Sequence, residues 1–324
     1  MEIGSFIELQ MPKGLEYYKG DKNIARLNTG RAAIFHAFRH TECEVIWLPY
    51  YQCDTVRDFL LRKGFTNIKY YHIDKLFRPI DIVQKSREAV LLVNYYGLMS
   101  NQRMRELANQ FKNVIIDNSQ AFFSQPIDSC YNIYSARKFM GVPDGAYVIG
   151  DNASKYVDEY EQGYSSDTSL FLLQRIEFGC EGKAYESRSL NEHRVDTEDI
   201  KKMSKLTRYL LDGYDYEYIK NKRQENFALA HELLKDRNLI DIESLVDRDI
   251  IPMVYPLVIE NDELLKVLLH HKHFQGHWWS YLLDEIDSDS VEYWLSRYII
   301  PITIDQRYGE KEIKYISSII HSVN

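Results

Sequence analysis

The sequence predicts an α/β protein: a large domain with a mainly parallel sheet flanked by helices, followed by a smaller C-terminal α+β domain. Three observations predict this class. The length of 324 residues is enough for one large and one smaller domain. Up to Gly150, short apolar segments alternate with amphipathic segments, which is typical of βαβ units. Beyond Gly150, segments with apolar residues at helical spacing are mixed with strand-like ones.

The expected strands are short apolar runs that end at turn residues or polar residues. They are Glu44–Tyr51, Asn67–Ile73, Ala89–Gly97, Asn113–Asp117, Tyr131–Ser135 and Ala146–Gly150. In parallel sheets of this kind the ligand binds at the carboxyl ends of the strands. Asp117 and Ser135 both end a strand, so we expect them in one site.

The expected helices are placed by their start and stop signals. Cys53–Gly64 is closed by its glycine, and Asn101–Lys112 has Asn101 as its N-cap. Asp196–Leu234 has apolar residues at helical spacing and is expected to form long helices that link the two domains. We therefore expect an N-terminal segment at 1–20, a large domain at 21–214 and a small domain at 215–324.

The composition excludes several classes of protein. The net charge of −8 argues against a nucleic-acid partner and against an anionic membrane surface. The N-terminal segment contains Glu2 and Glu8 and lacks the apolar core of a signal peptide, and no run is long enough to span a membrane. The four cysteines form no CxxC pair, so a cytoplasmic, reducing setting is expected.

A possible phosphate site lies at Thr29-Gly30-Arg31, where a helix is expected to begin. Free N–H groups at a helix start bind phosphate, Gly30 permits close approach, and Arg31 adds positive charge. An ordinary helix cap explains the same residues, and the pattern alone favours that alternative. The stretch is neither a Walker loop nor GxGxxG, so a nucleotide-binding fold is unsupported.

Asp117 ends the apolar run of VIIDNSQAFF. An acid placed there loses hydration unless a cation meets it, and a protonated pyridine nitrogen is such a cation. Gln120 could reach the same ligand. An Asx turn at a strand end is the alternative, and it explains Asp117 equally well.

Lys138 follows Ser135 by three residues, before the turn Pro143-Asp144-Gly145. An amine must be deprotonated to attack a carbonyl, and partial burial would lower its pKa. Ser135 could donate a hydrogen bond to a phosphate. A surface lysine is the ordinary alternative. The possible phosphate site, the strand-end acid and the Ser-x-x-Lys stretch together indicate a lysine that forms a Schiff base.

Several stretches resemble the DegT/StrS-like aminotransferases, a family of fold-type-I pyridoxal-phosphate enzymes. These stretches run in family order over most of the chain; they are LNTGRAAI, IWLPYYQCDTV, LLVNYYG, VIIDNSQAF, YSARKFMGVPDGAYV, KNKRQENF and IIPITIDQRY. The resemblance implies an aspartate-aminotransferase-like fold, pyridoxal 5′-phosphate as the cofactor, and a homodimer with the active site at its interface.

The resemblance also implies roles for single residues. Lys138 would bind the cofactor covalently, Asp117 would pair with the pyridine nitrogen, and Gln120 would lie by the ring hydroxyl. Ser135 and the turn Thr29–Arg31 would hold the phosphate.

An aromatic residue after the proline of LPYYQC usually covers one face of the cofactor ring. Tyr51 is the candidate, although the register also allows Cys53. Arg137 and Asn94 are candidates for substrate contacts, and a structural ion pair explains Arg137 equally well.

The implied function is an aminotransferase that moves an amino group from an amino acid donor, such as glutamate, to a keto-sugar. Nucleotide-linked sugars for surface polysaccharide are the common substrates of the family. This chain differs from the sugar-transferring members in two respects. They usually have more residues between the serine and the lysine than this chain has between Ser135 and Lys138. They also have a Gly-Glu-Gly-like turn where this chain has Pro143-Asp144-Gly145. Two alternatives stay open: another pyridoxal-phosphate reaction (dehydratase, lyase or racemase), or a non-catalytic sensor with this fold.

No metal is expected. His270, His273 and His277 would share one face of a helix, but Gly276 interrupts that helix and the run has no Asp, Glu or Cys. We also expect Arg307 to form a structural ion pair.

Overall fold

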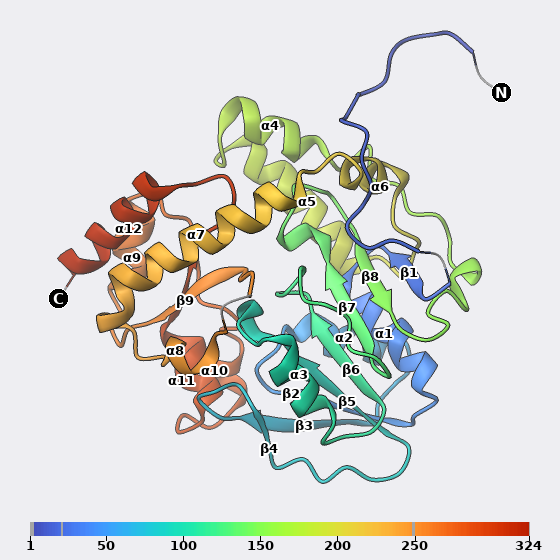
Figure 1. Ribbon diagram of the computed structural model, residues 1–324, viewed down its shortest axis with the longest axis horizontal. Coiled ribbons are helices and arrows are strands. Elements are labelled where there is room, and N and C mark those ends of the chain that lie inside the picture. Colours follow the sequence, from blue (N-terminus) through green and yellow to red (C-terminus); the bar gives the residue numbers. More distant parts are fainter. Residues whose placement is uncertain (1–2, 21, 248–249, 324) are drawn as a thin grey trace.

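The computed structural model describes residues 3–20, 22–247 and 250–323. The first two residues of the expected N-terminal segment, and residue 21 where the large domain is expected to begin, lie outside this description. An eight-stranded sheet in the order β1-β8-β7-β6-β5-β2-β3-β4 dominates the structure (Figure 1). Its strands are β1 (Ile24–Leu27), β2 (Val45–Pro49), β3 (Ile68–Ile73), β4 (Pro79–Ile80), β5 (Glu88–Val93), β6 (Val114–Asn118), β7 (Tyr131–Ser135) and β8 (Ala146–Ile149).

The sheet is mainly parallel, as predicted. β3, β2, β5, β6 and β7 pair in parallel, while β8 is antiparallel to both β7 and β1. The short edge strand β4 is antiparallel to β3. Because β1 and β7 both run opposite to β8, the carboxyl ends of β1, β2, β5, β6 and β7 all lie at one edge of the sheet.

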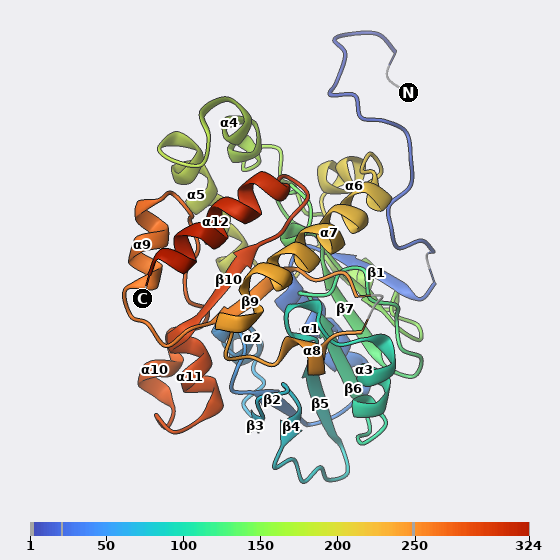
Figure 2. The ribbon, with the colours of Figure 1, turned by 60° about the vertical axis from the view of Figure 1, so that its left-hand side comes forward.

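Both faces of the central strands are buried, which explains why they are apolar throughout. Side chains alternate between the faces: Ala89 and Leu91 pack with helices α1 (Gly30–Thr41) and α2 (Asp54–Arg62), whereas Val90 and Leu92 pack on the side of α3 (Asn101–Ala108). The views in Figures 1 and 2 show the sheet between these layers.

Helix α3 differs from the expectation at both ends. Its N-cap is Ser100 and not Asn101, because the Ser100 hydroxyl accepts a hydrogen bond from Arg103 N (3.3 Å). It ends at Ala108, before the expected Lys112. The backbone N–H and carbonyl of Lys112 bond to the Gln84 side chain instead, at 2.8 and 2.6 Å.

The expected helical stretch Asp196–Leu234 is interrupted. Helices α4 (Leu170–Phe178) and α5 (Lys183–Thr197) precede it, with α5 ending just inside it, and α6 (Lys205–Leu211) and α7 (Tyr216–Leu234) follow within it. Between α5 and α6 the chain lies beside the end of β1, where Asn28 N donates to Lys201 O (2.9 Å) and Met203 N donates to Arg26 O (3.0 Å). These bonds to β1 replace helical bonds, so the expectation of long helices holds for α7 and is wrong for the segment between α5 and α6.

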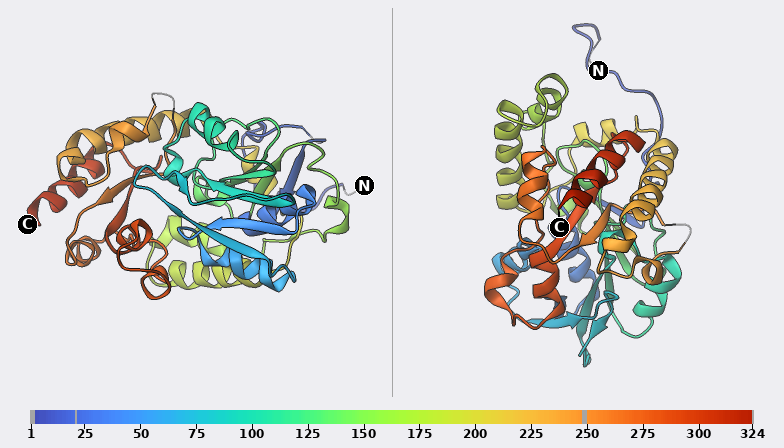
Figure 3. Two further views of the ribbon diagram at one scale, coloured as in Figure 1. Left: turned by 90° about the horizontal axis from the view of Figure 1, so that it is seen from below. Right: turned by 90° about the vertical axis from the view of Figure 1, so that its left-hand side faces the viewer.

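The C-terminal part contains a second sheet of two antiparallel strands, β9 (Val254–Val258) and β10 (Ile299–Thr303). The helices around it are α8 (Ile242–Leu245), α9 (Leu264–His270), α10 (Leu282–Glu285), α11 (Val291–Tyr298) and α12 (Glu310–Ser322). Figure 3 shows this part at the end of the molecule opposite the N-terminus.

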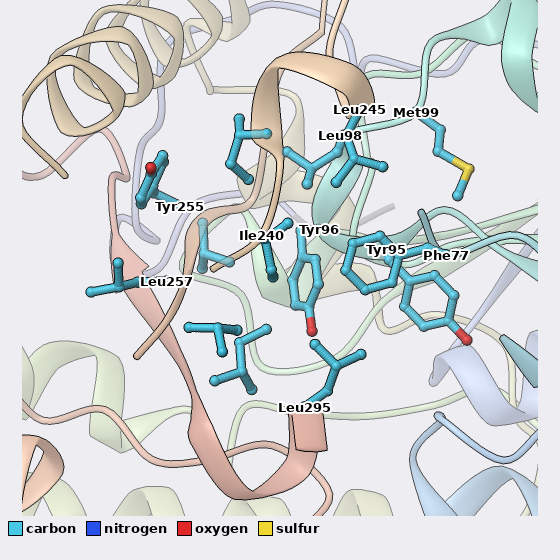
Figure 4. Close-up of a cluster of buried hydrophobic side chains, with 14 of the residues drawn as sticks. Phe77, Tyr95, Tyr96, Leu98, Met99, Ile240, Leu245, Tyr255, Leu257 and Leu295 are labelled. Atoms are coloured by element: carbon cyan, nitrogen blue, oxygen red, sulfur yellow. The ribbon is translucent and has the colours of Figure 1, made fainter. Parts of the chain in front are cut away.

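One hydrophobic core extends across both sheets. Tyr95 and Tyr96, beside the large sheet, lie in the same buried cluster as Ile240, Leu257 and Leu295 of the C-terminal part (Figure 4). The boundary expected at 214/215 falls just before α7, and it stays a prediction. The shared core fixes the C-terminal part against the edge of the sheet where the predicted site lies.

Candidate functional site

The strand register brings the predicted site residues to one edge of the large sheet. Ser135 pairs with Ala146, and Ala146 pairs with Leu27, so the residues after β1 lie two strands away from Ser135. Asp117 pairs with Ile133 on the other side of β7. Carboxyl ends of strands are where such sheets bind ligands.

Gly30 lies against Ser119. A Cβ atom built on Gly30 would lie 3.2 Å from the Ser119 hydroxyl oxygen, which is closer than a normal contact. Thr29 precedes the helix as its N-cap, and its hydroxyl accepts a hydrogen bond from Ala32 N (3.2 Å). The first N–H groups of α1 have no partner within the helix, so they are available to an anion at this point.

Arg31 is already paired. Its guanidinium binds the carboxylate of Asp196 on α5 (2.6 Å) and the carbonyl of the same residue (3.2 Å). The Arg31 side chain is 10% exposed. A phosphate at Gly30 would therefore meet an arginine whose charge is partly neutralised.

Asp117 is buried at the end of β6. Its Oδ1 accepts a hydrogen bond from Ser119 N (2.8 Å), as in the Asx turn that the sequence leaves open. Burial, with the nearby charge of Asp117, raises the pKa of Tyr71 well above its ordinary value. Oδ2 of Asp117 has no hydrogen-bond partner in the described ranges, so one oxygen remains for a ligand.

Gln120 is buried and held by the loop after β5. Its Oε1 accepts a hydrogen bond from Tyr96 N (2.9 Å). Gly97 lets the two loops approach, because a Cβ there would lie 2.7 Å from Gln120 O, and its φ is +74°. The amide nitrogen Nε2 of Gln120 has no protein partner among residues 3–20, 22–247 and 250–323.

Ser135 ends β7, and the turn Ala136–Lys138 follows it directly. The Ser135 hydroxyl bonds to no other described side chain or backbone group. The expected partial burial of Lys138 is wrong for the single chain, whose Lys138 side chain is exposed. Ala136 and Phe139 stand three residues apart in a 3-10 turn and both point into the core, so Lys138 points away from it.

The ammonium of Lys138 forms no ion pair or hydrogen bond with any described group. The neighbouring Arg137 is paired with Glu192 of α5. This contact is the structural ion pair that the sequence left open, although it does not test a further role in substrate binding.

The turn after Lys138 is fixed against α6. The buried carboxylate of Asp144 accepts hydrogen bonds from the backbone N–H (2.9 Å) and hydroxyl (2.8 Å) of Ser204 and from the hydroxyl of Thr207. Gly145 has a φ of +116°, and a Cβ there would lie 2.9 Å from the Thr207 methyl group. The Pro-Asp-Gly turn thus has a defined structural function.

Tyr51 and Asn94 belong to the packed interior. Tyr51 is fully buried, its hydroxyl lies 2.7 Å from that of Tyr96, and its ring contacts Trp279 edge-on at 4.4 Å. Asn94 is also fully buried, and its side chain bonds both backbone groups of Met99 at 3.2 Å. Neither side chain is exposed to a ligand in the single chain.

One cavity lies close to Tyr51 but away from Asp117 and Lys138. It has a volume of about 110 Å³ and lies between the end of β2 and the C-terminal part, with Gln52, Cys53, Tyr281 and Glu285 among its walls. Neither Asp117 nor Lys138 lines it.

Ser119 is a candidate site residue that sequence reasoning missed. It lies between Asp117 and Gly30, it is buried, and its hydroxyl has no partner within the described chain. Its position two residues after Asp117 was the available signal, because both then belong to the same turn.

Three further points concern Arg307, metal-binding groups and membrane-spanning helices. Arg307 forms the expected ion pair with Asp305 (2.7 Å). No group of three His, Cys, Asp or Glu side chains is placed to hold a metal ion within the described ranges. Among those residues, no helix has the length and apolar character needed to cross a membrane.

By sequence, no family model and no curated protein matches this chain. By structure, the chain is similar to several solved proteins. The sugar aminotransferase CalS13 from Micromonospora echinospora is 13% identical, with a TM-score of 0.63 over 93% of this chain and 88% of that one. Helicobacter pylori PseC, an aminotransferase involved in the biosynthesis of pseudoaminic acid, is 13% identical, with a TM-score of 0.62 over 96% and 92%.

A third neighbour is a GDP-4-keto-6-deoxymannose-3-dehydratase, ColD, whose structure holds GDP-perosamine. It is 13% identical, with a TM-score of 0.64 over 93% of this chain and 88% of that one. At such identities the likeness concerns the fold. This chain has the fold shared by these sugar aminotransferases and this sugar dehydratase.

Proposed function

We propose that this chain is a pyridoxal-phosphate-dependent aminotransferase that transfers an amino group from an amino acid donor, such as glutamate, to a nucleotide-linked keto-sugar. The observation that supports the proposal is that the strand register brings Gly30, Asp117, Ser119 and Ser135 to one edge of the sheet, where the turn with Lys138 follows β7. The proposal is supported by the fold shared with CalS13, a sugar aminotransferase, and with PseC, an aminotransferase involved in the biosynthesis of pseudoaminic acid.

The residues present fit the cofactor. Because Gly30 has no side chain, the start of α1 can lie close to the Ser119 hydroxyl. We propose that the phosphate binds there, to the first N–H groups of α1 and to the hydroxyls of Ser135, Ser119 and Thr29. Arg31 would contribute from its pair with Asp196.

The other end of the cofactor would meet Asp117 and Gln120. The free Oδ2 of Asp117 would pair with the pyridine nitrogen, and the Nε2 of Gln120 would donate to the ring hydroxyl. When bound, pyridoxal phosphate supplies an electron sink for the bonds at the amino-acid Cα. Lys138, with no competing partner, would hold the cofactor and then move the proton at that carbon.

Contacts within the single chain limit which residues can bind the substrate or cover the cofactor ring. Arg137 and Asn94 were the sequence candidates, but Arg137 is paired with Glu192, and Asn94 is fully buried. Tyr51 is buried against Trp279, so it would cover the ring only after that contact opens. Cys53, which the register also allows, is half-buried and lines the 110 Å³ cavity.

We also propose that the chain acts as a homodimer in the cytoplasm. Helix α4 has no buried side chain in the single chain, although it carries Leu173, Ile176 and Phe178, which are 59%, 83% and 59% exposed. Large apolar side chains this exposed and grouped on one helix are typical of an interface, so a second copy would cover them. The same copy could cover the exposed Lys138. All four cysteines are free, which fits a reducing compartment.

A dehydratase is the second candidate, because the likeness to ColD matches the likeness to the aminotransferases. The two reactions differ in the fate of the amino donor. Transamination consumes glutamate and yields a keto acid in amounts equal to the aminated product.

The test uses purified protein with pyridoxal phosphate and a panel of amino donors. We expect a yellow protein whose cofactor absorbance is bleached by glutamate and restored by a nucleotide-linked keto-sugar. Lys138→Ala should lose the absorbance of the attached cofactor. A colourless protein that binds no cofactor would refute the proposal and favour a non-catalytic role. Bleaching without net transfer of nitrogen would favour the dehydratase.

A further inference from the structure

A continuous series of contacts connects the Gln120 loop to the Lys138 turn through the C-terminal part of the chain. Tyr96 N donates to Gln120 Oε1 (2.9 Å), and Tyr96 O accepts a hydrogen bond from Met253 N (2.8 Å). Met253 O in turn accepts a hydrogen bond from Nη1 of Arg223 (2.9 Å). Arg223 lies over the ring of Phe139, the residue after Lys138, with its guanidinium carbon 4.5 Å from the ring centre.

Arg223 is an unusual residue for this position. It lies in α7 and is 2% exposed, and its Nε has no hydrogen-bond partner. Its Nη1 also donates to Pro252 O (3.3 Å). Burying a guanidinium has a large desolvation free energy, and an apolar side chain would fill the same space without it. What arginine adds is a planar group that stacks on a ring while it donates to carbonyl oxygens.

A second contact holds the backbone of Phe139. The Nε2 of Gln306 donates to Phe139 O (2.8 Å). The loop that carries Gln306 is fixed to α7 by Asn226, whose side-chain amide donates to Ile304 O and Tyr308 O, both at 3.1 Å. Phe139 is therefore held at its ring and at its carbonyl, and its N–H closes the Lys138 turn onto Ala136 O (3.0 Å).

We infer that Arg223 and Gln306 are positioning residues that set Lys138 relative to Gln120 and Asp117. Both act through Phe139. The inference rests on the proposed function, because that function requires Lys138 to be correctly placed relative to the cofactor. It also makes the C-terminal part of the chain necessary for attachment of the cofactor at the large sheet.

The experiment compares Arg223→Lys and Gln306→Leu with the matched control Arg237→Lys. Arg237 also donates to a backbone carbonyl, that of Ile320, but within the C-terminal part. Two rates are measured well below the thermal midpoint of each variant. One is the attachment of pyridoxal phosphate to the full-length protein, and the other is the labelling of Lys138 by an amine-reactive reagent without cofactor.

We expect attachment to be slower by about tenfold or more in both positioning variants and unchanged in the control, because small misplacements of a reacting group are costly. The labelling rate of Lys138 should also change in these variants. In a Phe139→Leu background, Arg223→Lys should have no further effect on either rate.

Two results overturn the inference. Arg223→Lys and Gln306→Leu could lower the thermal midpoint yet leave both rates equal to those of the control, which would make the contacts purely structural. An undiminished effect of Arg223→Lys in the Phe139→Leu background would show that Phe139 is not the link. If the unaltered protein attaches no cofactor, the proposed function fails, and the labelling of Lys138 still decides the positioning.

Discussion

The Ser119 hydroxyl oxygen lies 3.2 Å from the point that a Cβ atom on Gly30 would occupy. This relationship joins the first turn of α1 to the turn that holds Asp117, although the two residues are far apart in the sequence. It places the free N–H groups at the start of α1 beside a free hydroxyl. We propose that the cofactor phosphate binds to these N–H groups and to this hydroxyl.

Gly30→Ala tests that placement. The φ of Gly30 is not left-handed, so alanine should change the free energy of unfolding by less than about 1 kcal/mol. The new methyl group would push against the Ser119 hydroxyl and separate it from the N–H groups of α1, so the dissociation constant for pyridoxal phosphate should rise about tenfold or more. Equilibrium dialysis measures the affinity, and urea unfolding measures the stability.

The double variant Gly30→Ala, Ser119→Ala separates crowding from loss of a hydrogen bond. If crowding against Ser119 causes the effect, the second substitution should recover part of the affinity. Normal affinity in the single Gly30→Ala variant would place the phosphate elsewhere.

Asp117→Asn removes a charge and keeps the shape. A neutral amide stabilises a protonated pyridine nitrogen much less than a carboxylate does, so cofactor affinity should fall by about tenfold to a hundredfold. The control is Asp128→Asn, because Asp128 is exposed on the loop before β7. This variant should bind pyridoxal phosphate with normal affinity. Equal affinities in the two variants would remove Asp117 from the site.

Ile176→Glu tests the homodimer. Ile176 is 83% exposed on α4, and a charge there should raise the dimer dissociation constant by about tenfold or more if a second copy covers the helix. Val83→Glu alters another exposed apolar residue, 74% exposed, on the loop before β5. Sedimentation equilibrium compares the two. A monomer in the unaltered protein, or a dimer that tolerates Ile176→Glu, would rule out this face as the interface.

We expect the buried His36 to make the free energy of unfolding depend on pH. It is fully buried on α1, and burial lowers its pKa to about 4. Its Nε2 must carry the proton, because it donates to Ala153 O (2.7 Å), while Nδ1 faces the Tyr160 hydroxyl (2.9 Å). The unfolded chain binds a proton near pH 6.5, so between pH 6.5 and about 4 it holds more protons than the folded chain.

The free energy of unfolding should therefore fall as the pH is lowered through that window, by at most about 3 kcal/mol from this residue. Urea unfolding at a series of pH values measures the slope. His36→Gln should reduce the slope of the free energy of unfolding against pH. His271→Gln should leave the slope unchanged, because His271 is exposed. An equal slope in both variants would mean that His36 is protonated in the folded state.

The large sheet could be predicted from sequence because its signals are local. The strand Tyr131–Ser135 was predicted at its observed bounds, and the alternation of apolar and amphipathic segments predicted a mainly parallel sheet. Asp117 and Ser135 could be placed at one edge because carboxyl ends of parallel strands share it.

The remaining features depend on partners that are distant in the sequence. Nothing near Arg31 indicates that it pairs with Asp196, and nothing near Tyr51 indicates that Trp279 covers it. The exposure of Lys138 depends on the spacing of its buried neighbours within a 3-10 turn, which the composition of the stretch does not specify.

The most direct test of the account is to find where the cofactor attaches. Protein incubated with pyridoxal phosphate is reduced with borohydride, digested and analysed by mass spectrometry. The account predicts one modified peptide, with the cofactor on Lys138, and no such peptide from Lys138→Ala. Attachment to a different lysine, or none above the level of exposed surface lysines, would contradict it.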